Sequence, residues 1–203
     1  DTLEERYKAS FPTLVGLGRA DSEGIPLGNS PVAEVSPDHY RIICEACFGY
    51  LWNQPNLTFE QRSLATMSAL VVLRRDRNLK GHLLSGLDVG FSPAQLSEIM
   101  LQLLFYVGAP MSNTAIRVLQ EVFEERGIKI DPIRAFDTTE DPEALYQRGL
   151  ATRREIMWDS AEADLANGDD VDQAWDRYEV EYLWGSVWPR PGLTRQQRVL
   201  CTL

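Results

Sequence analysis

The sequence contains FGYLWNQPNLT at residues 48–58 and, 136 residues later, WGSVWPRPGLT at residues 184–194. The match continues to the last residue without a gap, and nine of twenty aligned positions are identical, Arg62 and Arg198 among them. Upstream, Glu4 and Tyr7 echo Glu143 and Tyr146 at a slightly different offset. Self-similarity of this length predicts that one structural unit occurs twice in the chain.

The repeat divides the chain into two expected parts. Residues 1–130 form the first repeat, and residues 131–203 form acidic connector helices followed by the start of a second, truncated repeat. The second copy stops at Leu203 inside its first core helix, so we expect further chain or a neighbouring subunit to cover the apolar face of that helix. Glycine, proline and polar residues predict a loop at Gly16–Pro37 and a linker at Ile128–Asp141.

Helical signals dominate the remainder. Thr58 with Gln61, and Ser92 with Gln95, have the spacing of capping boxes, and apolar residues recur behind each box at helical intervals. No stretch of comparable length alternates like a strand, so the predicted fold class is all-α. The expected helices are residues 58–75, 77–89, 92–107, a segment that ends at Gly127, residues 142–158 and residues 171–184.

Composition and charge exclude several classes of protein. The 44% apolar content supports a packed core, and no apolar run approaches the ~20 residues of a membrane span. The net charge of −10 lies within Asp131–Glu181, which holds 15 acidic and 5 basic residues. We therefore expect no nucleic-acid partner and no membrane. Three cysteines and the lack of a secretory leader favour a reducing, cytoplasmic location.

The ordered motifs resemble the carboxymuconolactone decarboxylase family, within the alkylhydroperoxidase D-like superfamily. The resemblance rests on residues 188–200 (WPRPGLTRQQRVL), on Arg62-Ser63-Leu64 followed 20 residues later by His82, and on residues 106–110 (YVGAP). It implies an antiparallel helical bundle that assembles as a homo-oligomer, a trimer or hexamer. A sister group carries a redox Cys-x-x-Cys at the positions of Arg75 and Asn78, so that chemistry is not expected there.

The resemblance further implies a decarboxylase that acts, without cofactor or metal, on a small anionic unsaturated lactone such as 4-carboxymuconolactone. His82 would transfer the proton to carbon, and Glu98 would orient His82 or Arg62. The expected substrate-binding residues are Arg62, Lys80, Tyr106 and Arg198, of which the cations hold negative charge.

Each of these residues also has a purely structural interpretation. His82 can be a half-buried histidine bonded to a carbonyl, Arg62 can pair with Glu98 or Glu60, and Tyr106 can pack in the core. Asn78 stands where a carboxylate is expected one turn before His82, and Gly81 is equally unexpected.

Three other functions remain open on the sequence. The same site suits a cofactor-free isomerase or cyclase. Cys44 and Cys47 form a Cys-x-x-Cys that a thiol oxidoreductase or, together with His39 and His82, a zinc site would use. Their repeat partners Val180 and Leu183 are apolar, which favours two buried cysteines on an apolar helix face. A non-catalytic assembly subunit predicts a bonded His82 without a cavity.

Overall fold

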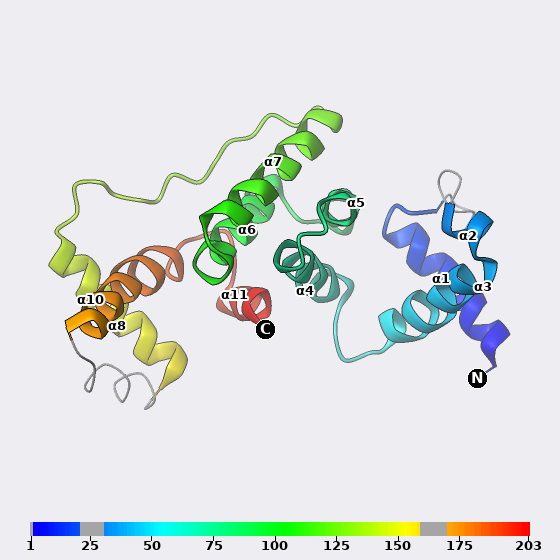
Figure 1. The fold of residues 1–203 in the computed structure, drawn as a ribbon, viewed down its shortest axis with the longest axis horizontal. Coiled ribbons are helices and arrows are strands. Elements are labelled where there is room, and N and C mark those ends of the chain that lie inside the picture. The colour runs from blue at the N-terminus through cyan, green and yellow to red at the C-terminus, as the bar shows by residue number, and fades with distance from the viewer. Residues whose placement is uncertain (1, 21–30, 159–169) are drawn as a thin grey trace.

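The computed structural model describes residues 2–20, 31–158 and 170–203, and within these residues every regular element is helical (Figure 1). The all-α fold predicted from the sequence is confirmed. The elements are α1 (Leu3–Gly16), α2 (Pro31–Val35), α3 (Pro37–Ile42), η1 (Ile43–Tyr50), η2 (Leu51–Asn53), α4 (Phe59–Val72), α5 (Asp76–Val89), α6 (Pro93–Val107), α7 (Ala109–Glu125), α8 (Pro142–Met157), α10 (Asp170–Tyr178), η3 (Glu179–Val187) and α11 (Arg195–Thr202).

The centre of the molecule is a bundle of α4, α5, α6 and α7, joined by α11 from the end of the chain (Figure 1). Its core consists of apolar side chains that recur at helical spacing, so that each helix turns one stripe inward. Leu193 and Cys201 of the C-terminal segment belong to this same core. The second segment is therefore packed into the bundle that the first one builds.

Two helical hairpins lie at opposite ends of this bundle (Figure 1). One pairs α1 with η1, and the other pairs α8 with η3; both η1 and η3 are π-helical. The pairs cross closely because each has a glycine at the crossing. A Cβ on Gly49 would lie 1.8 Å from the Arg6 carbonyl oxygen, and a Cβ on Gly185 would lie 2.6 Å from the Leu145 oxygen.

Capping explains where the bundle helices begin. The hydroxyls of Thr58, Ser92 and Thr194 each accept a hydrogen bond from the third helical N–H, while the glutamine at that position bonds back to the cap. At the other end, Gly90 stops α5 with φ at 118°, a conformation that glycine adopts without strain.

The predicted loop and two predicted helix ends need correction. Pro31–Val35, within the predicted loop, is the short helix α2, and residues 21–30 of that loop lie outside the described residues. The helix predicted at 58–75 ends at Val72, and the one predicted at 171–184 continues as η3 to Val187. The Asn-Gly-Asp-Asp sequence at residues 167–170 predicts a turn; its last residue, Asp170, begins α10, and residues 167–169 lie outside the described residues. No described helix is both long and apolar enough to span a bilayer.

Candidate active site

One face of α5 carries the polar residues around His82. Asn78 and Ser85 lie one turn before and one turn after His82, which places all three on the same side of the helix. The Ser85 hydroxyl donates to the Gly81 carbonyl at 3.0 Å and accepts from Arg19 Nε at 3.2 Å. An arginine from the N-terminal segment thus joins this face of the bundle.

A cavity of about 370 Å³ opens over this face, and its lining includes two arginines, an asparagine and a serine. Asn78, Gly81 and Ser85 form the wall on α5, while Gly18 and Arg19 form the opposite wall. The Arg19 guanidinium extends to Gly81, where a Cβ would lie in ordinary contact at 3.6 Å from Nη2. The complete lining is Gly18, Arg19, Arg77, Asn78, Gly81, Leu84 and Ser85.

A glycine turn after α1 places Arg19 in this cavity. Gly18 has φ at 63°, and the Arg19 N–H bonds to the Leu14 carbonyl at 2.8 Å, which reverses the chain at the helix end. Gly18 also lies against α5, where a Cβ would come within 2.3 Å of an Asp88 carboxylate oxygen. Any larger residue at position 18 is therefore excluded twice, by conformation and by space.

The electrostatics of the site are dominated by an arginine that lacks a carboxylate partner. Among the described residues, the Arg19 side chain bonds only to Ser85, and burial lowers the pKa of its guanidinium. Burial, and then the positive charge of Arg19, lower the pKa of His82 to about 4. At neutral pH the site therefore holds an uncharged imidazole near an arginine that has no carboxylate partner in the described part of the chain.

Sequence reasoning missed Arg19 because it lies in Gly16–Pro37, the segment that was predicted as loop and that the family resemblance leaves out. The one available signal was Gly18 directly before it, since a glycine after an amphipathic helix marks a turn. That signal places the turn, but it does not say which helix the arginine meets.

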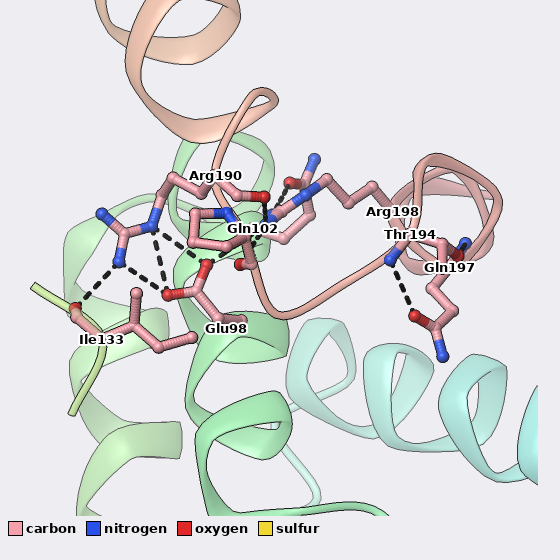
Figure 2. Close-up of polar contacts among 8 residues, drawn as sticks. Glu98, Gln102, Ile133, Arg190, Thr194, Gln197 and Arg198 are labelled. Carbon is pink, nitrogen blue, oxygen red and sulfur yellow. Dashed lines mark hydrogen bonds and ion pairs between the residues drawn. The ribbon is translucent and has the colours of Figure 1, made fainter. Parts of the chain in front are cut away.

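Glu98 lies in a different cluster, buried between two arginines of the C-terminal segment (Figure 2). Arg190 bonds to both Glu98 oxygens through Nε and Nη2, at 2.7–3.1 Å. Arg198 reaches Glu98 at 3.2 Å and Gln102 at 2.9 Å, and no part of its side chain is exposed. The expected pairing of Glu98 with His82 or Arg62 is thus replaced by pairing with Arg190 and Arg198, which leaves Arg198 no surface for substrate.

The other candidates lie apart from His82 and from one another. Arg62 donates to the Gln54 carbonyl at 2.7 Å, and its repeat partner Arg198 donates to the Arg190 carbonyl at 2.8 Å. The Nε of Arg62 is buried without a hydrogen-bond partner among the described residues. Lys80 is partly exposed and pairs with two glutamates of α7. The Tyr106 hydroxyl accepts a bond from Trp188 Nε1 at 3.2 Å.

Two further cavities suit an anion less well. One of about 340 Å³ contains Arg148 and Arg190, but these pair with Glu140 and Glu98. The other, of about 560 Å³, lies between α4, α6 and the end of α11, and no charged side chain lines it; its lining is Leu57, Ala65, Ser68, Ala69, Val72, Leu73, Leu103, Tyr106, Val107, Leu200, Cys201, Thr202 and Leu203.

The cysteine pair lies inside the N-terminal hairpin. Cys44 is buried with Leu14 and Ala20, and burial raises the pKa of its thiol, while Cys47 is only partly buried. This placement agrees with cysteines on an apolar helix face and disfavours a reactive thiolate at Cys44. Among the described residues, no group of three or more His, Cys, Asp or Glu has the geometry of a metal site.

Comparison with known proteins identifies the fold family. The sequence model of the carboxymuconolactone decarboxylase family matches residues 37–121. The chain is 33% identical over 125 residues to 4-carboxymuconolactone decarboxylase of Acinetobacter baylyi, an alignment that covers 62% of this chain and 92% of that protein. It is 35% identical over 60 residues to nitrosuccinic acid decarboxylase npaB of Metarhizium robertsii, covering 29% of this chain and 42% of that protein.

Both relatives are named as decarboxylases, which supports a decarboxylase-type function. The family match includes α4 to most of α7 and therefore His82, whereas Arg19 and the Arg190–Arg198 segment lie outside it. The all-helical bundle, the family match and the nearly full coverage of the Acinetobacter protein agree, and the chain belongs to the carboxymuconolactone decarboxylase family.

Proposed function

We propose that this protein is a cofactor-independent decarboxylase of a small dicarboxylic acid, and that the cavity over α5 is its active site. The observation that carries the proposal is Arg19, which lines this cavity, has no carboxylate partner among the described residues, and lies along the turn of α5 that carries the uncharged His82. An anionic substrate would supply the missing negative charge.

The names of the two relatives point to a common chemistry. Carboxymuconolactone and nitrosuccinic acid each carry two carboxyl groups and an electron-accepting group, an unsaturated lactone in one and a nitro group in the other. Loss of CO2 leaves an electron pair that such a group can accept. We infer that the substrate here has the same two features, and an unsaturated lactone acid is the first candidate.

The protein then has three tasks: to hold the retained carboxylate, to stabilise the developing anion, and to deliver a proton to carbon. Arg19 and the side-chain amide of Asn78 suit the first two, because both line the cavity. The Ser85 hydroxyl donates to the Gly81 carbonyl and holds Arg19 in place. His82 suits the third, because it is the one histidine on this face of α5. Lys80, Tyr106, Arg62 and Arg198 are held elsewhere and have no part in this proposal.

The test is a decarboxylation assay on 4-carboxymuconolactone with a chelator arm. The wild type should release CO2, His82→Ala should lose turnover, and His39→Ala should keep it, because His39 is exposed on α3. Product analysis separates decarboxylation from isomerisation or cyclisation at the same site. Equal turnover in His82→Ala and the wild type would refute the role of His82, and loss of turnover with chelator would refute cofactor independence.

We also propose that the protein forms a homo-oligomer, a trimer or hexamer. The uncharged walls that α4 and α6 give to the cavity of about 560 Å³ support this, since an apolar surface favours burial against a second chain. Light scattering of the purified protein tests the proposal, and a monomer at micromolar concentration would refute it.

A further inference from the structure

A histidine that is uncharged at neutral pH lacks the proton that decarboxylation requires. Replacing a carboxylate by hydrogen consumes one proton for each CO2 released. His82, whose pKa is lowered to about 4, does not carry that proton in the free protein. The structure therefore raises the question of how His82 becomes charged when substrate is present.

Burial is the larger cause of the lowered pKa of His82, and the positive charge of Arg19 adds to it. Arg19 is the cause that an anionic substrate can remove. Its guanidinium lies along α5 from Gly81 to Ser85, in the turn that carries His82. Among the described residues only Nε forms a hydrogen bond, and the two Nη nitrogens can donate to an anion. A carboxylate bound there would cancel the positive charge beside the imidazole.

The other charged groups around α5 either are paired or are exposed. Lys80 pairs with Glu121 and Glu125 of α7, and Asp88 pairs with Arg126. On α4, Glu60 accepts a hydrogen bond from Gln197, and Arg62 donates to the Gln54 carbonyl. On α6, Glu98 pairs with the two C-terminal arginines. The exposed charges are Arg74, Arg75, Asp76 and Arg77 at the start of α5, and Arg117 and Glu124 on α7.

We propose that Arg19 is the substrate-binding cation of this site, and that its neutralisation by the carboxylate that the substrate retains lets His82 take up the proton that replaces the departing carboxyl group. This inference rests on the proposed function and adds to it a residue outside the family match. Binding and proton uptake are coupled, so that the site charges His82 only when a substrate is there to receive the proton.

The step balances without a further reactant. The bond between the departing carboxylate and its carbon breaks, CO2 leaves, and the electron pair passes into the acceptor group of the substrate. The N–H of the His82 imidazolium then transfers its proton to that carbon, and His82 returns to the uncharged form. The next proton comes from water when the next substrate binds.

Histidine NMR tests the coupling without any turnover. The chain has two histidines, so His39→Gln assigns the ring signals unambiguously. The His82 signal is titrated against pH in the full chain, alone and with succinate, a dicarboxylate that has no electron-accepting group to support decarboxylation. We expect succinate to raise the pKa of His82 in the wild type by the part that the charge of Arg19 lowers it, while burial still keeps it below its usual value.

Variants separate Arg19 from general charge effects. Arg19→Gln should raise the pKa of His82 without ligand and abolish the effect of succinate, while Arg19→Lys should retain part of that effect. The matched control is Arg75→Gln, which removes an exposed arginine at the start of α5 outside the cavity and should behave as the wild type. In the enzyme assay, Arg19→Gln should raise KM about tenfold or more, the loss of a charge-assisted hydrogen bond.

Each outcome decides one of the two proposals. A wild-type His82 titration that succinate leaves unchanged, whether or not succinate binds, overturns the role of Arg19, as does an Arg19→Gln variant that responds like the wild type. An active enzyme whose KM is unaffected by Arg19→Gln overturns it as well, and leaves the decarboxylase intact. Coupled binding in a protein that releases no CO2 supports Arg19 and refutes the decarboxylase instead.

Discussion

The buried, uncharged state of His82 predicts a specific loss of stability in acid. The pKa of His82 is about 4 in the folded protein, against 6.5 for the free side chain. Between these values the unfolded chain binds a proton that the folded protein does not, so the free energy of unfolding falls as the pH falls. The contribution approaches about 3 kcal/mol below pH 4 and is about 2 kcal/mol at pH 5, relative to pH 8.

The perturbation is His82→Gln, which removes the titrating group and keeps a polar side chain of similar size. Urea unfolding at pH 8 and at pH 5 gives the difference in stability for each protein. Other groups titrate in the same range, so the relevant quantity is the wild-type difference minus the variant difference, with an expected value of about 2 kcal/mol.

His39→Gln is the matched control, because it removes the exposed histidine and leaves His82 in place. The control should lose stability between pH 8 and pH 5 as the wild type does. The same loss in His82→Gln as in the wild type would refute the reasoning, since it would mean that His82 accepts a proton as readily when folded as when unfolded.

Three more predictions concern buried residues outside the candidate active site. Glu98→Gln leaves two arginines without their shared counterion, one fully and one largely buried, and should lower the free energy of unfolding in urea by about 3–5 kcal/mol. Gly49→Ala should lower it by about 3 kcal/mol, because its Cβ meets a backbone oxygen, whereas the control Gly16→Ala meets no atom within 4 Å and should change it little. Cys201, buried with a pKa raised to about 11, should react with iodoacetamide only on unfolding, while the partly exposed Cys47 reacts in the native protein; equal native rates would contradict this.

Helix positions were predictable because their signals are local. The capping boxes at Thr58 and Ser92 lie within four residues of the helices they begin, and the apolar stripe of α6 is visible at helical spacing. The predicted loop at Gly16–Pro37 was wrong over the short helix α2, whose five residues are too few for a period to emerge. Helix α1 went unpredicted because Pro12 and several charged residues interrupt its pattern.

The candidate site was predictable in only one residue, His82, and there through family spacing. Glu98 was singled out correctly as a carboxylate on a core helix, but its partners Arg190 and Arg198 come from 92 and 100 residues away. Nothing local to Glu98 distinguishes those arginines from Arg62. The choice depends on α11 packing against both α4 and α6, which is a tertiary contact.

The sequence by itself determined the helical class, the main helix starts and the family, because caps, periodicity and motif spacing act between residues that are close along the chain. Only the tertiary structure decided which charges meet. It placed Arg19 over α5, without a carboxylate partner among the described residues, and Glu98 between two C-terminal arginines. Burial and Coulomb interactions depend on distance through space, and the order of residues along the chain does not give that distance.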